Sequence, residues 1–537
     1  MSHLTYPYAS QRMATIARNG MVATSQPLAA QAGLDILKKG GNAVDAAIAT
    51  AACLTVVEPT SNGIGGDAFA LVWMKDQGKV HGLNASGPAP KNISIEKLKQ
   101  QGHEKMPVHG WTPVTVPGVP SAWATLSERF GRLPLTEVLK PAIEYARNGY
   151  PLSPILGKYW KRAHEIFKER FEGKPEYEEW FRVFAPNGKA PEIGEMWSSE
   201  DHANTLAEIA ETKAESFYRG ALADKIAEAS EKFGGFLSKE DLEAYQAEWV
   251  DPISVNYKGY DVWEIPPNGQ GLVALMALNI LKNDEFKHRE DVEAVHLQLE
   301  AMKQAFTDGK EYITDPKTMK TRVADLLSEE YGKACREKIT DKAQLPVPGT
   351  LPKGGTVYLA TADGEGNMVS YIQSNYMGFG SGIVVPGTGI GLQNRGADFS
   401  LDPEHENALQ PGKKTYHTII PGFMTKDNEA VGPFGVMGGY MQPQGHVQVA
   451  MNMIDFGLNP QAALDAPRWQ WLEGKKIEVE HTFPNHLVKQ LVEKGHQISV
   501  AHDSGGFGRG QVIVRNPETG VLTGGTEHRT DGSVASY

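Results

Sequence analysis

The sequence predicts a mixed α+β fold, because regions of helical and of strand-like character follow one another along the chain. Residues 26–58 have the apolar periodicity of two helices, with a break at Gly40-Gly41. Residues 120–350 are rich in charged residues and helix formers. From residue 356 onward the composition changes to β-favouring runs, glycines and turn residues, which indicates a boundary just before this residue.

The limits of the first elements can be read from the sequence. Asn42 is a suitable N-cap for the second helix, whose many alanines favour close packing against neighbours. Glu58-Pro59 ends this helix. Residues 68–73 form an apolar run that predicts a buried strand.

Two β-favouring runs, 356–362 and 368–374, flank a cluster of turn residues centred on Glu365 and predict a β-hairpin. Pairing the two strands symmetrically about Glu365 places Thr356 opposite Ser374. Facing residues on one side of a sheet have Cβ atoms about 5 Å apart. We therefore expect a second hydroxyl beside that of Thr356, able to orient it or to relay its proton.

A short Gly354-Gly355 segment leads into Thr356, an arrangement that suits a self-cleaving precursor. Cleavage between Gly355 and Thr356 would make the threonine a new N-terminus. Its α-amine, with an unperturbed pKa of roughly 8, could then act as general base for its own hydroxyl. The local pattern also fits an ordinary surface hairpin after a glycine-rich loop.

A second glycine pair, Gly438-Gly439, lies between a short apolar run and a helix-like segment, 445–456. Backbone N–H groups that are free near a helix start can hold an oxyanion, so this pair is a candidate oxyanion hole. A tight strand-to-helix turn with no chemical role is the alternative.

Composition limits the partners. The net charge of −12 and the pI near 5.8 argue against nucleic-acid or anionic-membrane binding and favour a small-molecule partner. Only Cys53 and Cys335 are present, without Cys/His metal spacing, so neither a metal site nor a disulfide is expected. Residues 1–8 lack the pattern of a secretory signal, and no apolar run reaches the ~20 residues of a membrane span, which predicts a cytoplasmic protein.

A series of motifs occurs in order along nearly the whole chain. They are Gly40-Gly41-Asn42-Ala43-Val44-Asp45-Ala46-Ala47, Val57-Glu58-Pro59, Gly63-Ile64-Gly65-Gly66, Tyr257-Lys258-Gly259-Tyr260, Pro266-Pro267, Phe379-Gly380-Ser381-Gly382, Asn394, Asp398-Phe399-Ser400, Gly438-Gly439 and Asp465-Ala466-Pro467-Arg468. With these motifs the chain resembles the γ-glutamyltranspeptidase (glutathione hydrolase) proenzymes of the N-terminal nucleophile hydrolase superfamily.

The resemblance implies a four-layer αββα sandwich, built from a heavy fragment 1–355 and a light fragment 356–537 as one intertwined fold. Thr356 matches the family nucleophile, Ser374 the assisting hydroxyl residue, and Gly438-Gly439 the oxyanion hole. The implied reaction is ping-pong acyl transfer from γ-glutamyl amides such as glutathione to water or an amine acceptor, without metal or organic cofactor. A homo-oligomer is left open.

The substrate-binding motif departs from the family pattern. The arginine that clamps the substrate α-carboxylate should fall near Ser86, where no arginine is present. Of the substrate-binding positions, only Asp398, which binds the α-amino group in the family, is plainly retained; Asn394 is one of the matching motif residues. The remaining family positions align with Tyr376, Arg395, His417 and Thr418.

Three functions follow from this pattern. The retained Asp398 favours γ-glutamyl amides, with Arg395 as a replacement for the lost clamp. A glutaryl or cephalosporin-type acylase of the same family is the alternative, and a catalytically idle member is the third. The segment 401–411 is shorter than in members that carry a lid loop, which predicts hydrolysis over transpeptidation.

Overall fold

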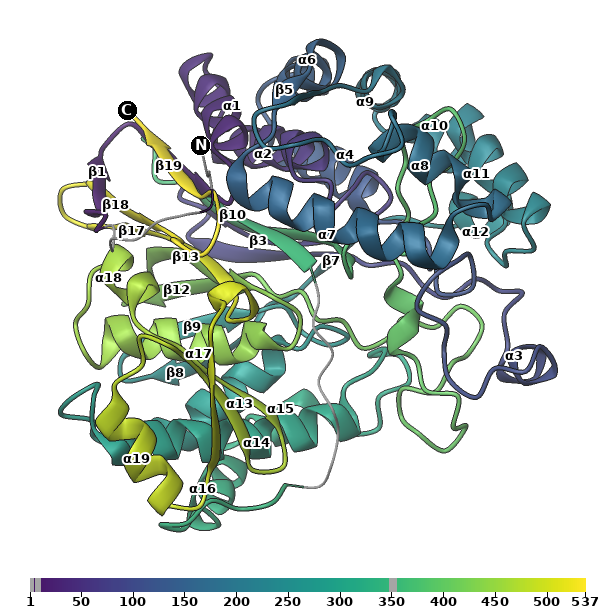
Figure 1. The fold of residues 1–537 in the computed structure, drawn as a ribbon. Helices are drawn as coiled ribbons and strands as arrows, with labels where there is room; N and C mark the ends of the chain where they lie inside the picture. Colours follow the sequence, from purple (N-terminus) through teal and green to yellow (C-terminus); the bar gives the residue numbers. More distant parts are fainter. Residues whose placement is uncertain (1–3, 5–10, 347–354) are drawn as a thin grey trace.

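The computed structural model of the chain describes residue 4, residues 11–346 and residues 355–537. Lys353, Gly354 and most of the N-terminal segment 1–8, on which parts of the sequence interpretation rest, lie outside the described residues. In the described part of the chain, two stacked seven-stranded antiparallel sheets are covered on their outer faces by helices (Figure 1). This is the predicted four-layer αββα arrangement.

The first sheet carries the predicted hairpin at its centre. Its strands, in spatial order, are β19 (Ser533–Ser536), β2 (Gly20–Thr24), β10 (Gly355–Asp363), β11 (Met368–Tyr376), β3 (Asp67–Met74), β4 (Lys79–Ala85) and β7 (Glu248–Val250).

The second sheet packs against the inner face of the first. Its strands, in spatial order, are β1 (Thr15–Ala17), β18 (Leu522–Thr526), β17 (Arg509–Arg515), β13 (Glu429–Met437), β12 (Gly422–Lys426), β9 (Tyr260–Glu264) and β8 (Ile253–Tyr257). Two smaller sheets join β14 (Trp469–Glu473), β15 (Lys476–Glu480) and β16 (Gln497–Ala501), and β5 (Tyr150–Pro151) with β6 (Met196–Trp197).

The outer helical layers come mostly from the first 340 residues. Over the first sheet lie α1 (Pro27–Lys38), α2 (Ala43–Val57), α4 (Val119–Phe130), α5 (Leu135–Val138), α6 (Lys140–Asn148), α7 (Pro154–Phe171), α8 (Glu178–Phe184), α9 (Glu200–Thr212), α10 (Glu215–Arg219), α11 (Ala221–Lys232) and α12 (Lys239–Glu243) (Figure 1). On the side of the second sheet lie α13 (Gly271–Leu281), α14 (Val292–Tyr312), α15 (Val323–Leu326), α16 (Glu329–Glu337), α17 (Met441–Ile454), α18 (Pro460–Asp465) and α19 (Asn485–Glu493), whereas α3 (Ile95–Gln100) is peripheral (Figure 1).

Three hydrophobic cores separate the four layers, and strand alternation explains them. In β10, Val357 and Leu359 pack with α2 on the helical side, whereas Tyr358 and Ala360 point to the core between the two sheets. The third core lies between the second sheet and α13, α14 and α17. A central strand buried on both faces thus needs an almost uninterrupted apolar run, as 356–362 has.

Most local predictions are confirmed. The helical region 26–58 forms α1 and α2, and Asn42 caps α2 through a capping box with Asp45. The strand predicted at 68–73 is β3. Ala362 pairs with Met368 in the hairpin, in the predicted register.

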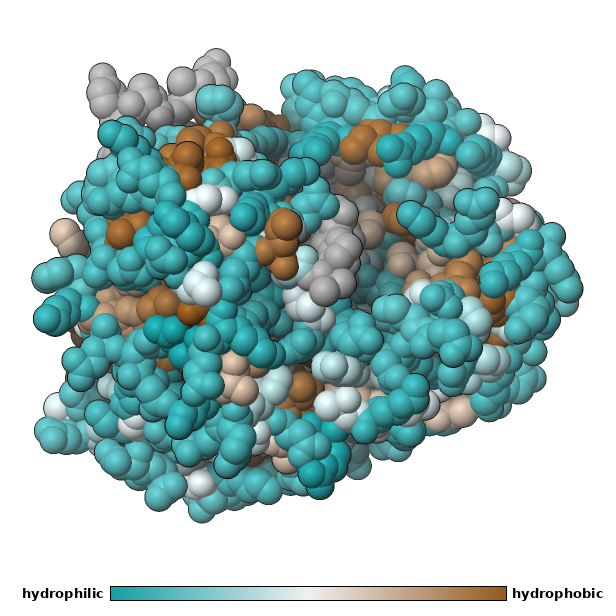
Figure 2. All heavy atoms as spheres, turned by 90° about the horizontal axis from the view of Figure 1, so that it is seen from below, coloured by the Kyte–Doolittle hydropathy of each residue, from teal (hydrophilic) through white to brown (hydrophobic). Residues whose placement is uncertain are grey.

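Both large sheets combine strands from before and after residue 355. In the first sheet, β10 and β11 lie between β2 and β3, and in the second sheet β12 and β13 lie between β9 and β17. A cut at residue 355 would therefore leave two fragments held together by both sheets. The face of the molecule in Figure 2 is largely hydrophilic, with small hydrophobic groups and one marked hollow.

Candidate active site

The hairpin of β10 and β11 brings the two predicted hydroxyl groups together. Thr356 Oγ1 lies 3.0 Å from Ser374 Oγ, and both side chains are buried. The regular register runs out to the pair Val357 and Gln373, and the backbone pairing shifts between Gly355 and Val357. The predicted neighbourhood of Thr356 and Ser374 is thus confirmed, at an irregular end of the hairpin.

Ser374 connects the threonine to the peptide bond that precedes it. Its hydroxyl donates to the carbonyl oxygen of Gly355 (2.8 Å) and accepts from the backbone N–H of Tyr376 (2.7 Å). A serine has a single hydroxyl proton, so the hydroxyl of Thr356 must donate to Ser374 Oγ. The arrangement polarises the Gly355 carbonyl and draws the threonine proton away from its oxygen.

Gly438 and Gly439 form the turn between β13 and α17. The helix begins at Met441, so the predicted start at residue 445 is wrong; the glycine turn leads directly into the helix. The φ angles of the two glycines are +139° and +58°, which a side chain would strain. Among the described residues, neither N–H group donates to an acceptor, so both are free to bind an anion.

A cavity of about 510 Å³ opens at this point of the structure. Its lining includes both Gly355 and Gly438, so it reaches the peptide bond before Thr356 and one of the proposed oxyanion donors. Thr356 itself is only 1% exposed. The candidate nucleophile thus lies behind the wall of the cavity while the chain is continuous.

Asp398 is the centre of a polar cluster adjoining the nucleophile. Its Oδ1 accepts hydrogen bonds from the hydroxyls of Tyr376 (2.6 Å) and Tyr440 (3.2 Å). Tyr376 follows Ser374 by two residues, and Tyr440 follows the glycine turn directly. The cluster is therefore fixed to both the nucleophile strand and the oxyanion turn.

Arg395 lies in the same cluster, three residues before Asp398. The arginine is 1% exposed, and its guanidinium packs 4.1 Å from the centre of the Tyr376 ring. Nη1 donates to Thr418 Oγ1 (2.8 Å) and lies 3.5 Å from Asp398 Oδ2. Nε and Nη2 are buried without a partner among the described residues, which leaves the side-on fork of the guanidinium free.

Lys310 adds a second cation to this cluster. Its ammonium lies 4.1 Å from the centre of the Tyr440 ring, and Asp398 attracts it. Burial raises the pKa of Asp398, although Arg395, Tyr376 and Lys310 counteract this. Burial lowers the pKa of Lys310, and Arg395 also interacts with the buried carboxyl of Asp67, so the two basic side chains lie near two acidic ones.

His417 and Asp67 form a buried pair beside this cluster. Ile419 N–H donates to His417 Nδ1 (3.4 Å), so Nε2 carries the proton that binds Asp67 Oδ2 (2.9 Å). Burial lowers the pKa of His417 well below its usual value and raises that of Asp67 to about 7. The neutral imidazole is therefore a hydrogen-bond donor to the carboxyl group of Asp67.

Asn394 and Ser86 have internal partners as well. The Asn394 amide donates to the carbonyl of Val108 (2.9 Å) and accepts from the N–H of Met377 (3.2 Å). Ser86 donates to the side chain of Asn84 (2.7 Å). Of the six predicted substrate-binding residues, Arg395, Asp398, Tyr376 and Thr418 thus form one connected cluster, whereas Asn394 and His417 support it.

Sequence reasoning missed three residues of the site: Lys310, Tyr440 and Gln270. Gln270 Nε2 donates to the carbonyl oxygen of Gly439 (2.9 Å) and so orients the glycine turn. Lys310 and Gln270 come from segments far from 356 in the sequence, and no local pattern marks them. Tyr440 directly follows Gly438-Gly439, and its position next to a candidate oxyanion hole is the sequence signal that could have identified it.

Three potential metal ligands, His296, Glu300 and His496, lie within 4.8 Å of one another among the described residues. Their polar atoms have other uses: Lys303 Nζ binds Glu300 Oε1 (2.7 Å), and the two histidines share a hydrogen bond of 2.9 Å. Burial and nearby lysines lower the pKa of His496 to about 3. The group is a hydrogen-bonded network around an internal ammonium, and we assign no metal to it.

A four-layer sandwich with this hairpin at its centre is the fold of the N-terminal nucleophile hydrolases, a class of enzymes made as precursors. The chain belongs to the γ-glutamyltranspeptidase family, whose sequence model matches residues 29–537. None of the helices in the described ranges is long and apolar enough to cross a membrane.

Several relatives match over nearly the whole chain. The glutathione hydrolase-like YwrD proenzyme of Bacillus subtilis is 37% identical over 96% of this chain and 98% of its own length. The glutathione hydrolase proenzyme of Escherichia coli is 31% identical, over 97% of this chain and 92% of its own. The crystal structure of a cephalosporin acylase from Bacillus halodurans is 62% identical, with a TM-score of 0.97 over 99% of this chain and 98% of that one.

Proposed function

We propose that the chain is a self-processing amidohydrolase that cleaves amides of a short dicarboxylic acid, of the glutaryl type, through an ester on Thr356. The observation that carries this proposal is the free fork of Arg395, whose Nε and Nη2 are buried without a partner. Buried N–H donors are costly unless bound, and a carboxylate fits a guanidinium fork with two parallel hydrogen bonds. The acyl group would supply that carboxylate.

Self-processing comes first. Thr356 Oγ1 attacks the carbonyl carbon of Gly355 while Ser374 accepts the threonine proton and its own hydroxyl binds the carbonyl oxygen. The C–N bond to Thr356 breaks, the amine takes up the proton, and water hydrolyses the resulting ester. The products are a fragment ending at Gly355 and a fragment beginning with the free amine of Thr356.

The mature reaction uses the same groups with a substrate amide in place of the Gly355 peptide. The α-amine of Thr356 accepts the hydroxyl proton and returns it to the departing amine, while Gly438 and Gly439 hold the oxyanion. Water then attacks the acyl ester and regenerates the threonine. No step requires a metal or an organic cofactor.

The charge of the recognition cluster supports an acyl group without an ammonium. Asp398, which in γ-glutamyl recognition would bind that ammonium, already accepts two tyrosine hydroxyls and is flanked by Arg395 and Lys310. Bringing a further cation beside two cations is unfavourable. The 62% identical structure is named a cephalosporin acylase, which supports an acylase activity for this chain.

A γ-glutamyl amide is the second candidate, for one reason. Oδ2 of Asp398 is buried and has no hydrogen-bond donor among the described residues, so it could accept from a substrate ammonium. The relatives named as glutathione hydrolases support this reading.

Hydrolysis rather than transfer to an amine is expected from the segment 401–411. Leu401, Ala408 and Leu409 are buried in a small core with Ile95 and Leu98 of α3. None of the described residues that line the cavity comes from 401–411. Without a loop from 401–411 over the cavity, water should reach the acyl ester of the processed enzyme more easily.

Two measurements on the purified protein test the proposal. Intact mass spectrometry should show two fragments that meet at Gly355 and Thr356 in place of one 58.6 kDa chain. Initial rates with glutaryl and L-γ-glutamyl 4-nitroanilide should then show the higher kcat/KM for glutaryl. A single uncut chain would refute self-processing, and the reverse preference would establish the γ-glutamyl alternative.

A further inference from the structure

A row of polar side chains crosses the first sheet beside the candidate nucleophile. Ser374 of β11 pairs with Asp67 of β3 in the strand register, and Ser374 Oγ lies 3.0 Å from Thr356 Oγ1. Facing residues on one side of a sheet have Cβ atoms about 5 Å apart. His417 extends the row, since its Nε2 lies 2.9 Å from Asp67 Oδ2 and its ring packs 4.7 Å from that of Phe69. Asp67 therefore lies at the same end of the sheet as the candidate nucleophile.

The backbone also brings Asp67 close to Arg395. The N–H of Gln393 donates to the carbonyl oxygen of Gly65 (3.0 Å), and Arg395 and Asp67 follow these two residues at the same spacing. Of the charged groups that favour the ionised form of Asp67, Arg395 has the largest effect. An anion bound to the free fork of Arg395 would therefore lie near the carboxyl group of Asp67 as well as near Asp398.

The hydrogen-bonding capacity of Asp67 is only half used. The side chain is fully buried, Oδ2 accepts from the neutral ring of His417, and Oδ1 has no donor among the described residues. A buried carboxylate with a free oxygen is costly, and a proton on that oxygen removes the charge. Burial accordingly raises the pKa of Asp67 to about 7, although Arg395 and Lys414 oppose this. Asp67 can therefore gain or lose a proton near neutral pH.

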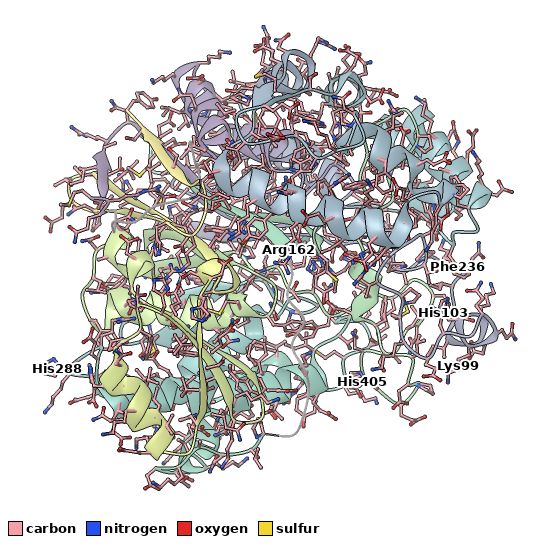
Figure 3. All side chains as sticks on the ribbon, viewed as in Figure 1. Lys99, His103, Arg162, Phe236, His288 and His405 are labelled. Carbon is pink, nitrogen blue, oxygen red and sulfur yellow. The ribbon has the colours of Figure 1, made fainter. Side chains whose placement is uncertain are left out.

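The ionisable side chains that act on Asp67 come from several other segments: Arg395, Lys414, His417, Tyr218 and Tyr245. Burial keeps three of them neutral, because it lowers the pKa of the histidine well below its usual value and raises those of the two tyrosines. The ammonium of Lys414 is paired with Glu248 (2.8 Å). Figure 3 shows His103 and His288 at opposite edges of the molecule, so these histidines do not belong to the buried group.

The charge of Asp67 and that of an acyl carboxylate oppose each other. Above pH 7 both would be ionised beside Arg395, and two like charges in a buried site repel each other. Below pH 7 Asp67 carries a proton, which leaves one anion fewer beside the guanidinium. Binding of an acyl carboxylate therefore favours the protonated form of Asp67, and the affinity should fall as the pH rises.

We propose that Asp67 is a specificity-determining residue that takes up a proton from solvent when the carboxylate of the acyl group binds to Arg395. The inference rests on the proposed function in one respect, which is that an acyl carboxylate occupies the free fork of Arg395. It adds a second buried carboxyl group to the recognition of the acyl group. It holds for glutaryl and γ-glutamyl groups alike, because both carry a carboxylate.

Binding of the free acid tests the inference without turnover. The probe is glutarate, titrated calorimetrically into the full-length protein at pH 6.5 and pH 8. We expect the affinity to be about fivefold lower at pH 8. Repeating the titration at pH 7.5 in buffers of different ionisation enthalpy counts the protons, and we expect an uptake of about half a proton. A purely structural role of Asp67 would not change this count.

The variant Asp67→Asn keeps an oxygen that can accept from His417 but cannot titrate. It should reduce the change in affinity between pH 6.5 and pH 8 to less than about twofold and abolish most of the proton uptake. Asp76→Asn, an exposed change in the turn at the far end of β3, is the matched control and should retain both. Asp398→Asn should also retain the pH dependence, since Asp398 is not the group that takes up the proton.

An affinity for glutarate that is equal at pH 6.5 and pH 8, an absence of proton uptake, or a pH dependence that persists unchanged in Asp67→Asn would overturn the inference. The proton count on the unaltered protein needs no variant, so it decides the matter even if Asp67→Asn does not fold. Titration of L-glutamate separates the two proposals. If L-glutamate binds with proton uptake and glutarate does not bind, the glutaryl assignment fails and the inference stands, whereas glutarate binding without proton uptake has the reverse meaning. If neither acid binds, the carboxylate site at Arg395 fails and the inference fails with it.

Discussion

The two halves of the proposed active site differ in charge. The chemical half, made of Thr356, Ser374 and the Gly438-Gly439 turn, contains only hydroxyls and backbone groups. The recognition half, made of Arg395, Asp398 and Lys310 with their tyrosine neighbours, contains the buried charges. In the proposed mechanism no proton is transferred to or from Arg395, Asp398 or Lys310, so a change among these residues should alter substrate binding more than the chemical step.

This separation explains how one family can serve different acyl groups. The hairpin and the glycine turn are fixed by backbone geometry, which a change of substrate leaves intact. By the family resemblance, the recognition cluster lacks an arginine near Ser86 and has one at position 395 instead. The following predictions ask whether the two halves are as independent as their composition indicates.

The largest effect is expected in the chemical half. Thr356→Ala removes the nucleophile for both self-cleavage and turnover, so the chain should stay intact at 58.6 kDa and hydrolysis should fall by a factor of about 10⁴ or more. Intact mass and initial rates measure both. Thr356→Ser keeps a hydroxyl and should still be cleaved; two fragments from the alanine variant would refute the assignment.

In the recognition half, Arg395→Met should lower kcat/KM for glutaryl amides by about 100-fold, the equivalent of a lost charge-assisted pair of hydrogen bonds. Cleavage at Gly355 should continue, since the hydrogen bonds of Thr356 and Ser374 do not involve the arginine. Arg395→Lys keeps the charge but not the pair of parallel donors, so its kcat/KM should lie between those of the unaltered protein and Arg395→Met. A variant that fails to mature although it folds, as judged by circular dichroism, would show that the halves are coupled.

Ser374→Ala should slow both cleavage and turnover by about 10- to 100-fold, because the threonine keeps its own amine as base in the mature enzyme. The time course of fragment formation after purification measures the first rate. Ser370→Ala, on the same strand and bound to Tyr358 instead, is the control and should mature normally. Unchanged cleavage and turnover rates in Ser374→Ala would show that Ser374 takes no part in the chemistry.

Asp398→Asn separates the two acyl candidates with a smaller effect. It keeps acceptor capacity for the tyrosine hydroxyls and removes the carboxylate charge, so glutaryl hydrolysis should change by less than about threefold. γ-Glutamyl hydrolysis should fall by about 100-fold if the ammonium binds there. Equal losses with both substrates would mean that Asp398 serves the structure of the cluster and not the choice of acyl group.

The residues of the chemical half could be predicted from the sequence, whereas the interactions of the recognition half could not. Thr356, Ser374 and the glycine pair follow from strand register and turn chemistry, which are local, and the structure brings them to the predicted places. The free fork of Arg395, the second cation Lys310 and the pairing of His417 with Asp67 depend on segments that meet only in the folded chain. Helix α17 begins at Met441, four residues before the predicted segment 445–456, and Pro443 lies in its first turn, where proline is tolerated.

The smallest effect concerns pH. His109 lies in the cavity beside Arg170, and its pKa is lowered to about 4, so it stays neutral at any pH above about 5.5. His109→Gln should therefore leave the pH dependence of kcat/KM unchanged between about pH 5.5 and 8, a range in which the α-amine of Thr356 and the carboxyl group of Asp67 are the groups expected to titrate. Initial rates with glutaryl 4-nitroanilide across this range measure it for both proteins. A profile that differs in His109→Gln would show that the histidine gains a proton when the substrate binds, and would place it among the groups that contact the substrate.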